Sequence, residues 1–263
     1  MQRLRGKVVI VTGASTGMGR AIAIALAGEG ATLGLVARTA SRLEEAASLA
    51  RADTADVVSF PGDVGDNQFV KRVIGTTVER FGRIDILVNN AGTNTFHRNL
   101  ADTSLPEWHQ VLNTNLTGAF LFVRYVLPHM RKAGRGQIIN ISSGAGLAPS
   151  GPAGVAYSAS KHALHSLNGS INQEERRHGI RACVIAPGET DTPNLDLRPL
   201  PPTKETREKM MQSEDIAGAV LFVATQPDHV SVDMLVMTPT APRNYQADYE
   251  RYTAAGHTSV ALE

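Results

Sequence analysis

Short apolar runs and longer mixed runs alternate along the whole chain. The apolar runs are rich in β-branched residues and predict strands at residues 7–12, 31–37, 56–60, 84–88, 136–142, 180–186 and 233–238. The runs between them predict helices at residues 18–29, 40–52, 66–81, 107–132, 155–178 and 214–225. This alternation indicates one parallel sheet, and because crossovers are right-handed, helices should cover both faces of a doubly wound α/β fold.

No linker rich in Pro, Ser or Gly divides the chain, so we expect a single Rossmann-type domain over residues 1–242. Within it, residues 193–212 are Pro-rich with scattered Leu, which is typical of a lid over a substrate site. Residues 243–263 form a C-terminal tail in which Tyr245, Tyr249 and Tyr252 share a helical spacing. Such a tail could dock on a second subunit or be loosely ordered.

Composition excludes several classes of protein. The 263 residues hold 26 Lys and Arg against 25 Asp and Glu, so a nucleic-acid partner is not expected. No apolar run reaches about 20 residues, so no membrane partner is expected either. The first residues lead directly into a strand and leave no room for a signal peptide, and the single cysteine, Cys183, lies in an apolar run. These features predict a cytoplasmic protein with no metal site.

A glycine-rich turn follows the first strand. Residues 8–11 are apolar, glycines stand at 13, 17 and 19, and residues 20–27 favour a helix. In this context the glycines allow a tight turn and a close approach to a pyrophosphate, which the N-terminus of the helix can hold. We therefore expect a dinucleotide site that includes Gly13, Ser15, Thr16, Gly17, Met18 and Gly19. The alternative is an ordinary turn between a strand and a helix.

The end of the second strand bears on which dinucleotide is bound. An acidic residue there would accept a hydrogen bond from the ribose 2′-hydroxyl and repel a 2′-phosphate. Here Ala37 occupies that place and Arg38 follows it. Because a guanidinium matches a phosphate in charge and geometry, we expect NADP(H), with NAD(H) as the alternative if Arg38 only faces solvent.

Candidate catalytic side chains follow the fifth strand. The strand ends at Ser142 and Ser143, and Tyr157 and Lys161 lie one helical turn apart in the helix that comes next. A free phenol has a pKa of about 10, and a nearby cation lowers it toward the range that suits proton transfer. Tyr157 could then give a proton to a carbonyl oxygen or take one from an alcohol.

The order of these motifs resembles that of the short-chain dehydrogenase/reductase family. The resemblance runs from about Lys7 to Thr192 and rests on Thr12 with its glycine turn, the Asn-Asn-Ala-Gly at 89–92, the serine pair and Tyr157 with Lys161. It implies hydride transfer between a nicotinamide cofactor and a small carbonyl or alcohol substrate. It further implies four catalytic residues: Asn115, Ser143, Tyr157 and Lys161.

In the family pattern Ser143 polarises the substrate oxygen, Lys161 also binds the nicotinamide ribose, and Asn115 holds a water that links Lys161 to solvent. The resemblance also implies that Asp63 and Val64 contact the adenine. The floor and the nicotinamide end of the site should comprise Asn90, Ala91, Gly92, Pro187, Gly188, Thr190 and Thr192. Helices 107–132 and 155–178 should pair between subunits of a homodimer or homotetramer.

Several interpretations stay open at this point. Glu189 could favour a polar or cationic substrate group or simply face water, and Phe96 and His97 could line the pocket or be solvated. A mid-helix asparagine predicts a kink or a held water, and Asn113 would suit a contact with a neighbouring subunit. A dinucleotide-sensing protein without turnover is a second class of function, which the intact set of Ser, Tyr, Lys and Asn disfavours.

Overall fold

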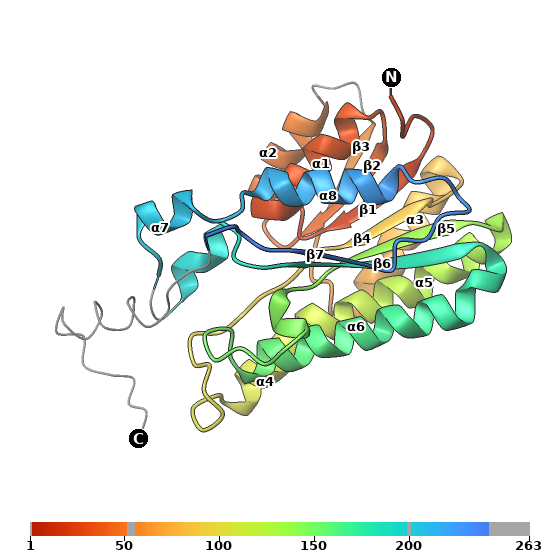
Figure 1. Cartoon of the computed structure of the whole chain (residues 1–263). Helices are drawn as coiled ribbons and strands as arrows, with labels where there is room; N and C mark the ends of the chain where they lie inside the picture. The colour runs from red at the N-terminus through yellow and green to blue at the C-terminus, as the bar shows by residue number, and fades with distance from the viewer. Residues whose placement is uncertain (1, 52–55, 199–200, 242–263) are drawn as a thin grey trace.

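Seven parallel strands form one sheet in the order β3-β2-β1-β4-β5-β6-β7 (Figure 1). This computed structural model describes residues 2–51, 56–198 and 201–241. The strands are β1 (Val8–Thr12), β2 (Thr32–Ala37), β3 (Val57–Pro61), β4 (Ile86–Asn89), β5 (Gly136–Ile141), β6 (Ile180–Pro187) and β7 (Met234–Met237). All seven predicted strands are present, and the doubly wound fold is confirmed. The chain reverses its direction of winding between β1 and β4, so a crevice opens at their carboxyl ends.

Helices cover both faces of the sheet, as Figure 1 shows. Helices α1 (Gly17–Gly28), α2 (Ala40–Arg51) and α8 (Ser213–Ala224) pack together on one face. Helices α3 (Asn67–Phe81), α5 (Gly118–Ala133) and α6 (Val155–Glu175) cover the other. The apolar strands are buried between the two layers, which matches their near-continuous hydrophobic sequences.

The predicted helix 107–132 is interrupted at its asparagines. Helix α4 (Leu105–Leu112) runs into a π-helical turn (Asn113–Thr117), and α5 follows directly. A π-turn changes the direction of the side chains that follow it and is frequent at functional sites. The irregularity expected at the asparagines takes the form of this π-helical turn, and Asn115 within it is 1% exposed.

Residue Asn113 packs within its own chain. A Cβ built on Gly65 would lie 2.0 Å from its Nδ2 atom. Asn113 thus lies against the turn after β3 but is exposed, and its contact with a neighbouring subunit stays a prediction.

The side chain of Asp66 caps the start of α3. The Asp66 carboxylate accepts hydrogen bonds from the backbone N–H groups of Gln68 (2.8 Å) and Phe69 (3.2 Å). Such a cap satisfies N–H groups that have no partner within the helix. Capping by Asp66 leaves the preceding strand end, with Asp63, available for another role.

A ladder of buried asparagines ties the middle of the sheet to α6. Asn89 at the end of β4 donates to Asn140 in β5 (3.0 Å), and Asn140 donates to Asn168 in α6 (3.0 Å). Because buried amides are costly unless they are hydrogen-bonded, this ladder fixes the register of β5 against α6. It thereby positions the two elements that carry Ser143 and Tyr157.

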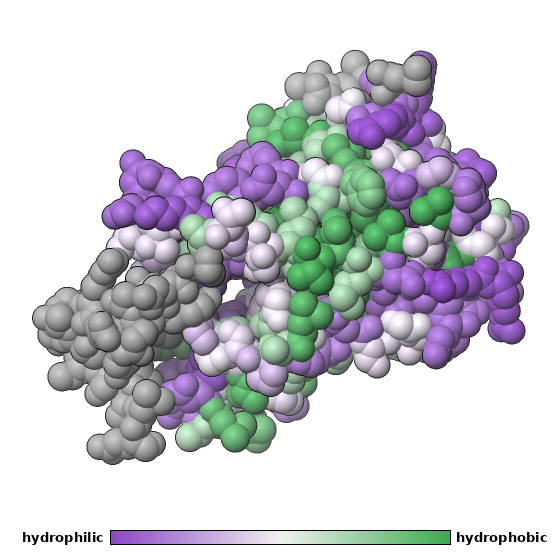
Figure 2. Space-filling view, viewed as in Figure 1, coloured by the Kyte–Doolittle hydropathy of each residue, from purple (hydrophilic) through white to green (hydrophobic). Residues whose placement is uncertain are grey.

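The edge strand β7 and the neighbouring α8 leave apolar side chains on the surface. Phe222 is 51% exposed, Met234 46% and Val236 48%. Figure 2 shows the green, apolar band on the face that carries these elements. The tail at 243–263, with its three tyrosines, lies outside the described residues.

Between β6 and α8 the Pro-rich segment adopts short elements that the sequence pattern did not predict. A 3-10 helix (Pro193–Leu197) and α7 (Lys204–Glu208) precede α8. Arg207 ties them together through ion pairs with Asp191 and Asp196. The segment thus stands over the carboxyl end of β6, where a lid is expected.

Candidate active site

A cavity of about 340 Å³ lies at the carboxyl ends of β1 and β4. Its walls come from the turn after β1, the ends of β2 and β3, and the Asn-Ala-Gly after β4. The residues expected there that do line it are Gly13, Ser15, Thr16, Gly17, Met18, Gly19, Arg38, Asp63, Val64, Asn90, Ala91, Gly92 and Thr192. The structure therefore brings most of the predicted cofactor contacts to one site.

Two of the glycines allow the close approach of β1, α1 and β4. A Cβ on Gly19 would lie 2.1 Å from the carbonyl oxygen of Gly13 and 2.5 Å from the Asn90 Nδ2 atom. Gly13 also has φ +66°, a conformation that side chains disfavour, and its added Cβ would lie 2.8 Å from the Cα of Ala91. We call the turn formed by Gly13, Gly17 and Gly19 the glycine cradle. Side chains at positions 13 and 19 would fill or distort it.

The Thr12 side chain joins the two strand ends. Its hydroxyl accepts hydrogen bonds from the N–H groups of Asn90 and Ala91, both at 3.0 Å. The Asn90 amide donates to the carbonyl oxygen of Thr12 (2.9 Å) in return. This exchange sets the floor of the cavity.

The cavity fits a dinucleotide. Thr16 precedes α1 without a side-chain capping bond, so the first-turn N–H groups of a 12-residue helix have no side chain to satisfy them. A pyrophosphate is a natural partner for such a helix N-terminus. The cradle closed to side chains and the uncapped helix both match the group that the sequence motif implies.

Two cations border this cavity just after the end of β2. Arg38 and Arg42 line the cavity, both are exposed, and the described residues form no ion pair with either of them. The Asp63 carboxylate is held by the N–H group of Gly65 at 2.8 Å. The sequence analysis missed Arg42, although its spacing of four residues from Arg38 could have indicated it.

A second cavity, of about 290 Å³, contains the predicted catalytic pair Ser143 and Tyr157. The predicted nicotinamide-end residues line it as well: Pro187, Gly188, Thr190 and Thr192. Met18, Thr192 and Asn194 line both cavities. The two cavities are therefore contiguous, and a dinucleotide seated in the first would extend toward Tyr157.

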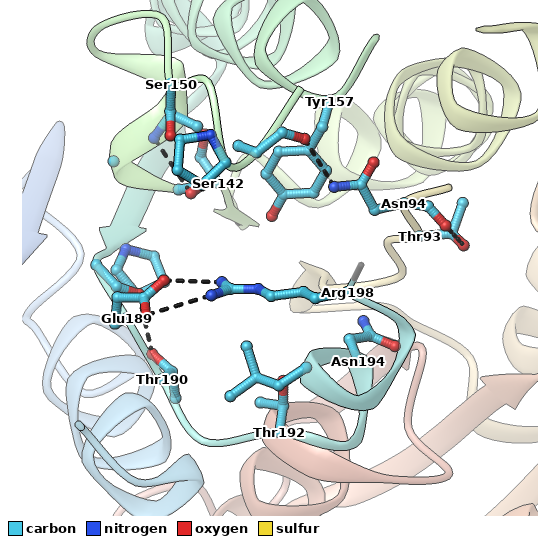
Figure 3. A pocket seen from close by; sticks show the side chains of 18 of the residues that line it. Thr93, Asn94, Ser142, Ser150, Tyr157, Glu189, Thr190, Thr192, Asn194 and Arg198 are labelled. Atoms are coloured by element: carbon cyan, nitrogen blue, oxygen red, sulfur yellow. Dashed lines mark hydrogen bonds and ion pairs between the residues drawn. The ribbon is translucent and has the colours of Figure 1, made fainter. Parts of the chain in front are cut away.

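Tyr157 lies in the first turn of α6, with its phenol in this cavity (Figure 3). Burial raises the pKa of Tyr157, while a hydrogen bond from Ser143 and the charges of Arg198 and Arg98 act in the opposite direction. The Ser143 hydroxyl is held in place because it accepts a bond from the N–H of Ala145 (3.2 Å).

Lys161 lines neither cavity and is 3% exposed. Its ammonium donates to the carbonyl oxygen of Ile141 (2.9 Å) and lies 5.5 Å from the centre of the Tyr157 ring. Burial lowers the pKa of Lys161 to about 8. A Cβ on Gly92 would lie 3.7 Å from its Nζ atom, so the ammonium stands directly behind the cavity floor.

Asn115 connects the π-turn to two other segments. Its Oδ1 accepts from the N–H of Thr93 (2.7 Å), and its Nδ2 donates to the Thr93 carbonyl and to the Ser160 hydroxyl, both at 3.0 Å. The side chain therefore fixes the loop after β4 relative to α6. That contact is structural, and the water relay expected of Asn115 stays a prediction.

The structure decides between the two readings of Glu189. Its carboxylate receives hydrogen bonds from Arg198 at 2.7 and 3.3 Å (Figure 3). Both side chains are largely buried, with 14% of Glu189 and 19% of Arg198 exposed. The reading that Glu189 merely faces water is wrong, because Arg198 of the Pro-rich segment compensates its charge; a role toward a polar or cationic substrate group stays a prediction.

The loop at 93–98 contributes other residues than expected. His97 pairs with Glu107 (2.9 Å) and is exposed, and Phe96 is 53% exposed. Neither lines the cavity, whereas Thr93, Asn94 and Arg98 do. Nothing in the sequence distinguishes Arg98 or Arg198 from other loop arginines, so sequence reasoning missed both.

Between residues 2 and 241, apart from the gaps at 52–55 and 199–200, no helix is long and apolar enough to cross a membrane. The same residues form no cluster of His, Cys, Asp and Glu that could hold a metal ion.

Comparisons with known proteins agree with this geometry. The sequence profile of the short chain dehydrogenase family matches residues 7–199. An uncharacterized oxidoreductase of Staphylococcus epidermidis is 34% identical over 91% of this chain and all of its own. A metagenomic short-chain oxidoreductase solved with NADP is 33% identical, with a TM-score of 0.79 over 91% of this chain and all of that one. An alcohol dehydrogenase from the archaeon Thermococcus sibiricus, solved with 5-hydroxy-NADP, is 32% identical. Its TM-score is 0.80, and the match covers 90% of this chain and 98% of that one.

Proposed function

The chain belongs to the short-chain dehydrogenase/reductase family of NAD(P)-dependent oxidoreductases, and we propose that it uses NADP(H) to interconvert a carbonyl and a secondary alcohol. The observation that carries this proposal is the continuity of the two cavities. The cavity at the glycine turn adjoins the cavity of Tyr157 and Ser143, and three residues border both. Such a layout suits a reaction between the far end of a dinucleotide and a small molecule.

The bound cofactor would supply or accept a hydride at the substrate carbon. In reduction, the Tyr157 phenol gives its proton to the carbonyl oxygen, and the product is an alcohol. In oxidation, the Tyr157 phenolate takes the proton from the alcohol. Ser143, which already acts on the phenol, hydrogen-bonds the same substrate oxygen and holds it beside Tyr157.

Lys161, which lies behind the cavity floor, assists this proton transfer. With a pKa of about 8 it exchanges protons near neutral pH, so it can help return Tyr157 to its starting state. We infer that Lys161 also binds the nicotinamide ribose and that Asn115 helps connect it to solvent. Through Thr93 and Ser160, Asn115 in addition holds the loop and helix that flank the site.

Preference for NADP(H) rests on the adenosine end of the first cavity. Ala37 occupies the position at the end of β2 where a carboxylate would favour NAD(H). Arg38 and Arg42 both border the cavity. Two guanidinium groups there would attract a 2′-phosphate and form charge-assisted hydrogen bonds with it.

We also infer that the protein assembles into a homodimer or homotetramer. The exposed apolar edge at β7 and Phe120 on α5, which is 43% exposed, offer two surfaces for a second copy. The mass in solution, measured by light scattering, tests this; a monomer would contradict it.

The substitution Tyr157→Phe tests the proposed chemistry. NADPH oxidation would be followed at 340 nm with small ketones and aldehydes. Loss of a general acid lowers turnover by about 10²–10⁴-fold, while the phenyl ring preserves the shape of the site and hence NADPH binding. A variant that keeps its turnover would contradict the role of Tyr157, and a variant that also loses NADPH binding would point to a folding defect.

A further inference from the structure

Among the residues that the structure describes, the lining of the catalytic cavity carries a net positive charge. The charged residues among them are Arg98, Arg198 and Glu189, two guanidinium groups against one carboxylate. Since burying an uncompensated charge is costly, a cavity built in this way calls for a negatively charged partner.

One of these cations is already neutralised. Arg198 and Glu189 form a partly buried pair with two hydrogen bonds, at 2.7 and 3.3 Å. This pair leaves Arg98 as the source of the excess charge.

Arg98 contacts only neutral acceptors. Its Nε donates to the carbonyl oxygen of Thr95 (3.1 Å) and its Nη1 to that of Pro152 (2.6 Å). In the described part of the chain no carboxylate lies within ion-pair distance of this guanidinium. The two bonds use two of its five N–H groups, so three are left for a ligand.

The backbone holds Arg98 close to the catalytic tyrosine. The N–H of Val155 at the start of α6 donates to the Arg98 carbonyl at 3.0 Å. A Cβ on Gly154, whose φ is +85°, would lie 2.7 Å from the Cβ of Arg98. Gly154 therefore permits the approach of Arg98 to the first turn of α6, where Tyr157 lies.

The energetics agree with this geometry. Burial and the nearby Arg198 lower the pKa of Arg98 to about 10, so the guanidinium stays charged at neutral pH although its surroundings disfavour the charge. An anion bound beside it would relieve that cost.

We propose that the substrate is a small oxo or hydroxy acid, whose carboxylate binds Arg98 while its carbonyl or hydroxyl oxygen lies at Tyr157 and Ser143. This proposal rests on the proposed function of the same site. A carboxylate carries one negative charge, which matches the net charge of the lining, and it accepts two parallel hydrogen bonds from a guanidinium. A phosphate dianion would leave an excess of negative charge instead. A cavity of about 290 Å³ suits a compact molecule.

The test compares acids with their amides, which have nearly the same shape but no charge. The pairs are pyruvate and pyruvamide, acetoacetate and acetoacetamide, and levulinate and levulinamide, which vary the distance from carbonyl to carboxylate. Each is assayed for kcat/KM with NADPH. For at least one pair we expect the acid to exceed the amide by about ten- to hundredfold, the range of hydrogen bonds to charged groups.

Variants assign that preference to Arg98. The substitution Arg98→Gln should reduce the acid-to-amide ratio to about one, and Arg98→Lys should keep part of it. Glu189→Gln releases Arg198 from its pair and should raise the ratio. Arg177→Gln removes an exposed arginine that lines neither cavity and should leave the ratio as it is. If Arg98 acts only on Tyr157, Arg98→Gln changes acid and amide turnover equally and the ratio stays constant, which would overturn the proposal.

A binding measurement separates this proposal from the proposed function. Butyrate and butyramide, which cannot be reduced, are titrated calorimetrically into the protein with and without NADPH. Binding of butyrate alone, lost in Arg98→Gln, supports the anion site even if no carbonyl compound is reduced. If butyrate and butyramide bind equally, or if neither binds at millimolar concentration, the anion site is overturned. This holds even if the protein reduces neutral ketones and the reaction requires Tyr157. A preference for dihydroxyacetone phosphate over dihydroxyacetone, without one for the acids, would identify a phosphate as the anion and contradict a carboxylate.

Discussion

The two cavities at the carboxyl edge of the sheet are held in shape by different means. The dinucleotide cavity is bounded by strand ends and one helix N-terminus, and backbone contacts such as those around Gly19 set its walls. The catalytic cavity is bounded by loops from distant parts of the sequence, joined by side chains such as Arg198 and Arg98. A substitution in a cavity whose walls are backbone displaces the elements around it. A substitution in a cavity lined by loop side chains can alter the charge of the cavity without altering the fold.

The largest effect should follow from breaking the backbone-built cavity. In Gly19→Ala the added Cβ would lie 2.1 Å from the Gly13 carbonyl, so α1 has to move away from β1. We expect NADPH binding to fall below detection by calorimetry and the free energy of unfolding to drop by about 1–3 kcal/mol.

Gly75→Ala is the matched control. Gly75 lies inside α3 with nothing within 4 Å of an added Cβ, so this change should stabilise the protein by about 0.5–1 kcal/mol. If Gly19→Ala bound NADPH as the unchanged protein does, the cradle would not have the role given to it here.

A smaller effect should follow at the junction of the two cavities. Asn115→Ala leaves the buried N–H and carbonyl of Thr93 without their partner, which costs about 1–3 kcal/mol of unfolding free energy. Turnover should fall because the loop at 93–98 and α6 lose their connection. Asn115→Asp keeps the acceptor for the Thr93 N–H but sets a buried carboxylate oxygen against the Thr93 carbonyl, so it should be no more stable than Asn115→Ala in chemical denaturation. Equal stability of all three proteins would contradict this positioning role.

The smallest effect concerns the charges of the catalytic cavity and their influence on pH dependence. In alcohol oxidation Tyr157 has to be deprotonated, so the rate rises as the pH passes through its pKa. The Arg198 charge lowers that pKa, and Arg198→Met should therefore shift the rising limb to higher pH.

Glu189→Gln frees the Arg198 charge from its partner and should shift the same limb to lower pH. The measurement is kcat/KM against pH for the three proteins. Shifts in the same direction for both variants would show that the pair does not act on Tyr157 through its charge.

The sequence predicted what depends on backbone geometry and local chemistry. Glycines 13, 17 and 19 follow a buried strand, and all three line the first cavity, because such signals lie within a few residues of one another. The asparagines at 113 and 115 likewise indicated an interruption of a long helix.

Contacts between distant loops could not be predicted in this way. Arg98 reaches Pro152 across 54 positions, and Arg198 of the Pro-rich segment reaches back to Glu189 after β6. His97, the more obvious candidate in its loop, is directed to Glu107 instead. Which loop side chain enters the cavity is decided by tertiary packing, which no local pattern encodes.

The most direct test of NADP(H) dependence is a pair of calorimetric titrations, with NADPH and with NADH, on the unchanged protein and on the double variant Arg38→Ala, Arg42→Ala. NADPH should bind at least about tenfold more tightly than NADH, since each charge-assisted contact to a phosphate is worth about that factor or more. The double variant should lose this difference and keep its affinity for NADH. Equal or tighter binding of NADH by the unchanged protein would contradict the assignment of NADP(H).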